Sequence, residues 1–310
     1  MKRASYRNRR LSDVTAEFFR KERNTLNNQD RRFITMLVQG TVRLSGRLDW
    51  ELRQVFIGDY QDLKENFCIL LRLGAYQLLY MSNVPNYAAV TTTVELAKRI
   101  HNNLGGLANA LLRNLIKIEE RVEPDKNSSI AILSNYLSHP DWLITKWMKY
   151  YNFEEVKLLA EWNNQNPLLW FRVNQLSYTQ DKFKDYLKKN RIEYTQFQHI
   201  QFFFQVNNNQ KLLNSNIFKD GKISVQDPAA GLVAKLVDPQ KDDEILDVCA
   251  APGGKTAYMA ELMGGDGKIK AFDSNADRLK KLDNTINRLK LSNIVSKPLD
   301  LIKDKFPLTD

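Results

Sequence analysis

Small and turn-forming residues occupy positions 250–254, between a short apolar run and a predicted helix. The apolar run at 245–248 is typical of a buried parallel strand, and the helix is expected over 255–263. A second predicted strand, 268–273, ends in an acid, Asp273, about 20 residues beyond the glycines. A strand, a glycine turn, a helix and a strand that ends in an acid form the nucleotide-binding half of a doubly wound sheet. The spacing therefore predicts a site in which a carboxylate holds an adenosine ribose.

Three ligands compete for such a loop, and the glycine spacing separates them. A dinucleotide site needs the spacing G-x-G-x-x-G, which this stretch lacks. A phosphate loop needs G-x-x-x-x-G-K-[ST]; Gly254, Lys255 and Thr256 supply its end, but Cys249 stands at the position of its first glycine. S-adenosylmethionine remains, because its single sulfonium needs no phosphate nest and its ribose suits Asp273. A fold of this type that binds no ligand stays open as the alternative.

The letters LDVCAAPGGKT, residues 246–256, closely resemble the cofactor motif of the NOL/NOP/Sun family of RNA cytosine-C5 methyltransferases. The resemblance implies a Rossmann-like α/β methyltransferase domain with S-adenosyl-L-methionine as its cofactor. It assigns Asp273 to the ribose hydroxyls and Asp300, after the strand-like residues 294–296, to the neighbourhood of the adenine. It also implies that the loop lines the cofactor, mostly through its backbone, at Cys249, Ala250, Ala251, Pro252, Gly253, Gly254 and Lys255.

Methyl transfer to C5 of cytosine needs a nucleophile, because the ring carbon alone is not reactive enough. A thiolate adds to C6, C5 takes the methyl group, and a base removes the C5 proton so that the thiolate can leave. The family supplies its two cysteines in the segments Asp-Ala-Pro-Cys-Ser-Gly and Thr-Cys-Ser, which this sequence lacks. Cys249 belongs to the cofactor loop and is no candidate. We therefore expect the nucleophile beyond Asp310, a C-terminally truncated enzyme, and no activity from this chain alone.

Positions 1–140 predict an all-α bundle, through apolar stripes at helical spacing. Residues 62–81 are apolar on most sides, so this helix is expected at the centre of the bundle. The letters LRLGAYQLLYM, VPNYAAVTTTVELAKR and GLANALLRNL resemble helices of the transcription antitermination factor NusB, in sequence and in order. The relatives carry Asn-Glu where this chain has Thr92 and Thr93, which weakens any role for those two side chains.

Positions 141–220 predict a helical pair followed by a small α+β module, and the family resemblance implies that this module binds RNA. Residues 167–174 and 201–206 have the period of strands, with a basic helix between them. The letters PLLWFRVN resemble the family signature P-x-x-x-R-V-N. The resemblance leaves two readings for Arg172 and Asn174, which either touch RNA or form a buried structural pair.

The methyltransferase domain is expected over 221–310, with a strand, a turn and a helix that lead into the cofactor strand. Val225-Gln-Asp-Pro resembles the family's entry motif, in which the aspartate helps to shape the methyl-transfer site. Asp227 has a second reading as the N-cap of the helix that begins at Pro228. Arg278, one turn into the helix after the ribose acid, either steadies the site or lies on a solvated surface.

Positive charge is concentrated in the first half of the chain, where residues 1–150 carry 23 Lys and Arg against 15 Asp and Glu. A basic half indicates a polyanionic partner, and a basic surface without a partner is the alternative. The resemblance implies that this partner is 16S ribosomal RNA. The side chains expected to contact its phosphates are Arg7, Arg9, Arg10, Arg31 and Arg32.

Composition excludes several other classes of protein. Two cysteines cannot form a disulfide framework, and the charged start MKRASYRNRR is no secretory signal. No apolar run reaches the roughly 18–20 residues of a membrane span. Three histidines without a cluster predict no metal site. We expect a monomeric cytoplasmic enzyme with no membrane partner, and the rival hypothesis is a NusB-like RNA-binding module whose methyltransferase half is vestigial.

Overall fold

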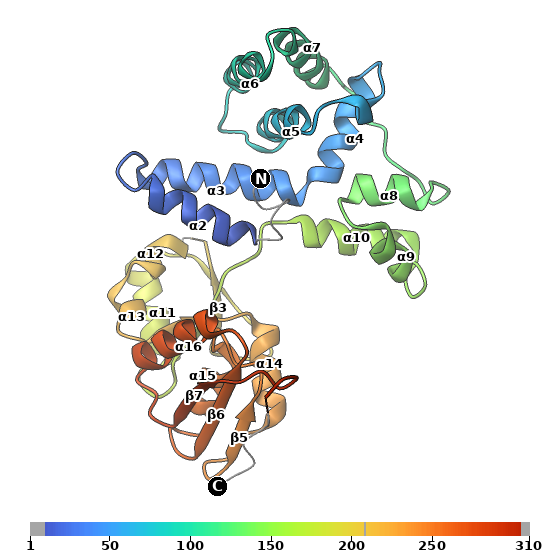
Figure 1. Cartoon of the computed structure of the whole chain (residues 1–310). Coiled ribbons are helices and arrows are strands. Elements are labelled where there is room, and N and C mark those ends of the chain that lie inside the picture. Colours follow the sequence, from blue (N-terminus) through green and yellow to red (C-terminus); the bar gives the residue numbers. More distant parts are fainter. Residues whose placement is uncertain (1–9, 208, 305–310) are drawn as a thin grey trace. The chain divides into compact units, whose positions relative to one another are not determined.

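The computed structural model describes residues 10–207 and 209–304 (Figure 1). The chain forms two compact units, one that ends at Asn166 and one that begins at Pro167. Arg7 and Arg9, two of the expected phosphate contacts, lie outside the described residues.

The first unit contains helices and no strand in its described part, as predicted. Its elements are α2 (Leu11–Lys21), α3 (Asn28–Arg43), α4 (Ser45–Val55), the 3-10 helix η1 (Tyr60–Asp62), α5 (Glu65–Tyr80), α6 (Asn86–Ile100), α7 (Leu104–Ile116), α8 (Ile130–Leu137), α9 (Asp141–Trp147) and α10 (Phe153–Asn164). A capping box begins α3: the side chain of Asn27 accepts from the N–H of Asp30, whose carboxylate accepts from the N–H of Asn27.

Helix α5 is central to the main core of this unit, as its apolar sequence predicts. Phe67, Leu71 and Ala75 have no exposed surface and pack with buried residues of α4, α6 and α7. Asp49 is nearly buried beside this core and accepts hydrogen bonds from Arg72 Nη2 at 2.6 Å and from the Tyr60 hydroxyl at 2.9 Å. These partners offset the cost of burying its carboxylate.

Helices α8, α9 and α10 form a smaller group with a core of their own, beside α4 (Figure 1). Leu137, Ile144 and Val156 are buried in it. Asn152 begins α10 through a second capping box with Glu155. The residues after α10 return to α3, where Arg43 Nη1 donates to three oxygens of residues 164–166.

The second unit holds two sheets with the strand orders β2-β3-β1-β4 and β5-β6-β7. Its elements are β1 (Trp170–Val173), α11 (Gln180–Lys189), β2 (Tyr194–Gln196), β3 (Phe203–Val206), α12 (Asn209–Leu213), α13 (Asn216–Lys219), β4 (Ile223–Val225), α14 (Pro228–Val237), β5 (Glu244–Asp247), α15 (Gly254–Leu262), β6 (Lys268–Asp273), α16 (Ala276–Leu289) and β7 (Ile294–Pro298).

The first sheet is antiparallel and forms the small α+β module. Phe171 on β1 stands opposite Phe204 on β3 and Val225 on β4. Phe183 of α11 packs edge-on against Phe204 in a core without exposed surface at either ring. Strand β4, which the sequence analysis groups with residues 221–310, is thus a member of this sheet.

The second sheet is parallel and begins the predicted doubly wound fold. Ile245, Ile269 and Ile294 stand opposite one another across its three strands. They pack with Tyr258 of α15 and Leu282 of α16. The expected sequence of a helical part, a small α+β module and an α/β methyltransferase-like part is therefore confirmed.

Three further properties concern the described residues as a whole. None of their helices is long and apolar enough to cross a membrane. They contain no group of three His, Cys, Asp or Glu side chains that could hold a metal ion. Both cysteines are free thiols, Cys68 buried and Cys249 exposed.

Candidate cofactor site

The loop between β5 and α15 is fixed at the carboxyl ends of two parallel strands. Ala250 donates its N–H to the carbonyl of Phe272, near the end of β6, at 2.9 Å. The hydroxyl of Thr256, in the first turn of α15, donates to Asp247 Oδ2 at the end of β5, at 2.7 Å. Gly253 has φ of 104°, and a Cβ there would lie 2.5 Å from a leucine of α16. Glycine is required at this position for both reasons.

The carboxylate of Asp273, at the end of β6, contacts both the loop before α15 and the start of α16. Its Oδ2 accepts from the N–H of Ala251 at 3.2 Å, and its Oδ1 accepts from the N–H of Asn275 at 3.0 Å. Arg278 places Nη1 3.5 Å from Asp273 Oδ2, and its Nη2 donates to the carbonyl of Ala251. These contacts favour the reading in which Arg278 steadies the site. The carboxylate of Asp273 is nearly buried, with 4% of the residue exposed.

The remaining predicted loop residues differ in exposure. Those that present their surface to solvent are Cys249, Pro252 and Lys255, whereas Ala250, Ala251 and Gly253 are buried. Asp300 follows β7 at the same edge of the sheet, because Leu299 donates its N–H to the carbonyl of Asp273 at 3.2 Å. The Asp300 carboxylate accepts from the N–H of Ile302 at 3.1 Å, and this bond is the main cause that lowers its pKa.

Gln226 is a residue of this site that the sequence analysis does not single out. It lies between β4 and α14, is 5% exposed, and neither atom of its amide has a hydrogen-bond partner within the described residues. Its side chain lies 3.8 Å from where a Cβ on Gly254 would stand. An unpartnered buried amide costs about 1–3 kcal/mol, so Gln226 offers an unused donor and acceptor beside the loop. The signal was present in Val225-Gln-Asp-Pro, but that motif draws attention to the aspartate.

Asp227 is exposed and caps α14. Its Oδ1 accepts from the N–H of Ala229 at 2.8 Å, and Pro228 takes the first helical position. This geometry is the N-cap arrangement of its second reading.

The expectation that Arg172 and Asn174 touch RNA is corrected by the structure, because both side chains are buried. Arg172 is 0% exposed; its Nη1 donates to Glu261 Oε2 at 2.5 Å and its guanidinium lies 4.3 Å from the ring of Tyr258. Asn174 is 1% exposed and donates to the carbonyl of Gly221 at 2.9 Å. The physical reason is that β1 is an inner strand of its sheet and Arg172 faces α15, so the structural reading holds.

Three family descriptions match successive parts of the chain. Residues 2–117 match the NusB family. Residues 139–211 match the ferredoxin-like domain of RsmF/B-like methyltransferases. Residues 234–307, which contain the loop and Asp273, match 16S rRNA methyltransferase RsmB/F.

Individual relatives match most of the chain in one alignment. The probable ribosomal RNA small subunit methyltransferase B of Bacillus subtilis is 32% identical over 286 residues, 90% of this chain. The protein of the same name from Synechocystis is 36% identical over 279 residues, 88% of this chain. The chain is therefore similar, in its successive parts, to the NusB family and to the 16S rRNA methyltransferases RsmB/F. It spans 62% of the length of both relatives, so the activity of the whole enzyme is a proposal here.

One solved structure is similar in fold over most of the chain. The crystal structure of PH0851 matches with a TM-score of 0.66 at 23% identity, and the match covers 92% of this chain and 63% of that one. At this identity the likeness concerns the fold.

The described arginines near the start of the chain differ in exposure. Arg31 is half-buried; its Nε donates to the carbonyl of Leu26 at 3.2 Å and its Nη2 to that of Arg23 at 3.3 Å. These bonds use Arg31 to hold the turn between α2 and α3. Arg10 and Arg32 are exposed and stay candidates for phosphate contacts.

Proposed function

We propose that the site around Asp273 binds S-adenosyl-L-methionine, in an enzyme that methylates C5 of a cytosine in 16S ribosomal RNA. Asp273 is the observation that carries the proposal. Its buried carboxylate ends the second parallel strand and is bonded to the N–H of Ala251 in the loop before α15. In doubly wound sheets, an acid at this place accepts hydrogen bonds from ribose hydroxyls.

The donors and acceptors around the loop fit the charged groups of this cofactor. The N–H groups of Gly254 and Lys255 have no backbone acceptor within the described residues, and they lie at the positive end of the α15 dipole. They suit a carboxylate, and the free amide of Gln226 suits the amino acid end of the ligand. Each oxygen of Asp273 accepts one backbone N–H and keeps capacity for a hydroxyl. When bound, the cofactor supplies an electrophilic methyl group.

Isothermal titration calorimetry tests this assignment. Asp273→Asn keeps the size of the side chain but removes charge-assisted acceptors, so binding is expected to weaken by about 1.5–3 kcal/mol, roughly 10- to 150-fold. Asp277→Asn is the matched control, because Asp277 lies on α16, four residues beyond Asp273, with its side chain 88% exposed. Equal affinities for the two variants would remove Asp273 from the ribose site. No S-adenosylmethionine binding by the unsubstituted chain would favour the rival, an RNA-binding module with a vestigial half.

Neither cysteine of the chain suits the nucleophile that adds to C6 of cytosine. Cys68 is 7% exposed within α5, and burial raises the pKa of its thiol and so disfavours the thiolate. Cys249 lies in the loop that we assign to the cofactor. We therefore propose that a cysteine outside these 310 residues forms the covalent adduct, and that this chain alone transfers no methyl group.

Incorporation of tritiated methyl groups into undermodified 16S rRNA tests whether the nucleophilic cysteine lies outside this chain. We expect no incorporation by the 310-residue chain, whether or not it carries Cys249→Ala. A chain longer by the segment with the family cysteines should be active, and Cys249→Ala in that longer chain should leave most of the activity. Incorporation by the short chain that Cys249→Ala abolishes would assign the nucleophile to Cys249 instead.

The proposal divides RNA binding and cofactor binding between parts of the chain. It assigns residues 1–140 and the module within 141–220 to 16S rRNA, and residues 221–310 to the cofactor. The excess of positive charge over 1–150 supports the first assignment. A monomeric enzyme in the cytoplasm, where the ribosomal substrate is found, completes the proposal.

A further inference from the structure

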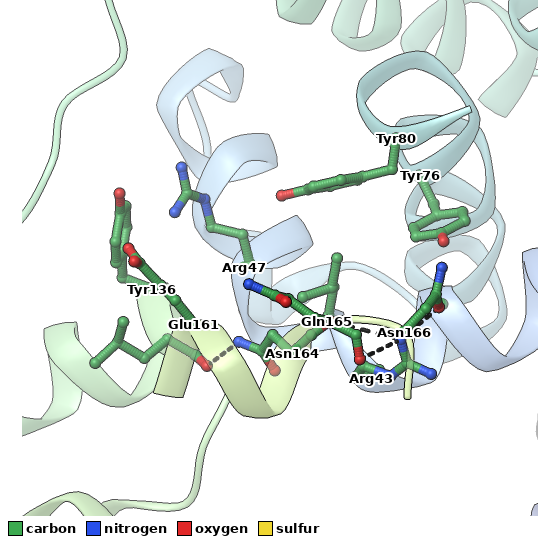
Figure 2. Close-up of a pocket in the computed structure, with 12 residues that line it drawn as sticks. Arg43, Arg47, Tyr76, Tyr80, Tyr136, Glu161, Asn164, Gln165 and Asn166 are labelled. Atoms are coloured by element: carbon green, nitrogen blue, oxygen red, sulfur yellow. Dashed lines mark hydrogen bonds between the residues drawn. The ribbon is translucent and has the colours of Figure 1, made fainter. Parts of the chain in front are cut away.

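A pocket of about 350 Å³ lies within the first unit, far in sequence from the cofactor loop. It is lined by residues of α3, α4, α5, α8 and the end of α10, and Figure 2 shows its side chains. We call it the tyrosine pocket, because Tyr76, Tyr80 and Tyr136 contribute to its lining. Its volume falls in the range of sites for small molecules and single nucleotides.

One wall of the tyrosine pocket is a prepared aromatic surface. The rings of Tyr76 and Tyr80 are stacked, with centroids 5.4 Å apart and planes at 23°. Tyr76 is 6% exposed and packs onto Gly40, where a Cβ would stand 2.0 Å from its Cζ. Tyr80 is 44% exposed, so it is supported from one side and accessible from another. Supported rings of this kind stack planar ligands at little cost in conformational entropy.

The pocket is lined by two arginines, Arg43 and Arg47, and by one carboxylate, that of Glu161. Arg43 Nη1 donates to the Gln165 carbonyl at 3.2 Å and to Asn166 Oδ1 at 2.8 Å, both neutral acceptors. Its Nε and Nη2 make no hydrogen bond or ion pair in the described parts of the chain. Arg47 shares the carboxylate of Glu51 with a second arginine, so this pair of cations has only one anion. Arg43, which bonds only neutral oxygens, is therefore the guanidinium that is available to an anionic group at the pocket.

The third element is a free amide that faces the ring. In Figure 2, the side chain of Gln165 and the ring of Tyr80 lie on opposite sides of the hollow. Gln165 is exposed, and its side chain makes no hydrogen bond with the described residues. An amide supplies one acceptor and two donors, which is what the edge of a nucleobase requires.

We propose that the tyrosine pocket binds one unpaired nucleotide of single-stranded RNA, with its base on Tyr80 and its phosphate at Arg43. The base must be unpaired, because only a base outside a duplex exposes its face and its edge together. The inference rests on the proposed function, in which the substrate is RNA. It deepens that function by adding a nucleotide site apart from the cofactor.

Fluorescence anisotropy with two labelled RNA probes, an unstructured oligonucleotide and a blunt duplex of the same length, tests the pocket. Tyr80→Leu removes the ring face and is expected to weaken oligonucleotide binding by about 5- to 150-fold, the effect of one lost base stack. Tyr80→Phe keeps the face and should bind like the unsubstituted chain. Duplex binding should be the same for all three proteins. Arg43→Gln should lower the slope of log affinity against log salt by about one.

Several outcomes would overturn the inference. Unchanged oligonucleotide affinity in Tyr80→Leu would show that no base stacks there, and an equal loss for the duplex would reduce the effect to surface charge. A phosphopeptide that binds in competition with the oligonucleotide, with greater affinity, would replace RNA by a protein partner. If the proposed function is wrong and RNA is not the substrate, the result differs: the unsubstituted chain would then bind neither probe nor 16S rRNA at low salt. The affinity of the same variants for S-adenosylmethionine, measured by calorimetry, should equal that of the unsubstituted chain in every case.

Discussion

The cofactor loop and the tyrosine pocket are built in opposite ways. The loop site takes most of its groups from consecutive residues, and several of these groups are backbone atoms held by a strand and a helix start. The tyrosine pocket takes Arg43 from α3, Tyr80 from α5 and Gln165 from the residues after α10, which are distant from one another in sequence. A site of the first kind can be recognised in one continuous stretch of sequence. The second exists only after the helices have packed.

The two regions also differ in how their charges are supported. In the second unit, the side chains of Arg172 and Glu261 are fully buried, with Nη1 and Oε2 2.5 Å apart. Arg172 lies on β1 and Glu261 on α15, the helix that begins at the cofactor loop. In the first unit, Arg43 is half-buried and bonds only neutral oxygens. Removal of charge should therefore affect stability strongly in the one region and weakly in the other.

Glu261→Ala is the change with the largest expected effect. It leaves the guanidinium of Arg172 buried without its partner, which typically costs about 3–5 kcal/mol of unfolding free energy. Arg43→Gln is the matched control from the first unit and should stay within about 0.5 kcal/mol of the unsubstituted chain. Urea denaturation followed by circular dichroism measures both changes.

A second variant distinguishes the cost of a buried unpaired charge from the cost of lost side-chain packing. Replacement of the whole pair, by Arg172→Met with Glu261→Leu, should recover most of the stability, because buried pairs are often replaceable by apolar side chains. If Glu261→Ala and Arg43→Gln cost the same small amount, the contrast between the two regions fails.

The sequence predicts those parts of the molecule whose physics is local. The strand, the loop, the helix and Asp273 follow from period, glycine chemistry and spacing, and the central place of α5 follows from its apolar faces. The pairing of β4 with β1 and the burial of Arg172 depend on contacts between distant segments. Arg172 follows two apolar residues, and this local sequence pattern is the same whether the side chain contacts RNA or packs against α15. The tyrosine pocket escapes sequence analysis for the same reason.

Gln226 lies between these two cases, and its expected effects are the smallest. It stands within a motif, yet its importance appears only from its burial and its lack of partners. Gln226→Leu replaces an unpartnered amide by an apolar side chain of similar size. Without ligand, the chain should gain about 1 kcal/mol of unfolding free energy, because the desolvation cost of the amide is removed.

The same substitution should weaken S-adenosylmethionine binding, by about 2- to 10-fold, if the amide of Gln226 bonds the cofactor with the strength of one ordinary hydrogen bond. Opposite signs of the two effects are the decisive feature, since a purely structural residue would not gain stability and lose affinity together. Gln165→Leu, an exposed amide in the tyrosine pocket, should change neither quantity. Thermal unfolding and calorimetry on the three proteins provide the measurements. Higher stability with unchanged affinity would make Gln226 an unsatisfied core residue and leave the loop and Asp273 to hold the cofactor alone.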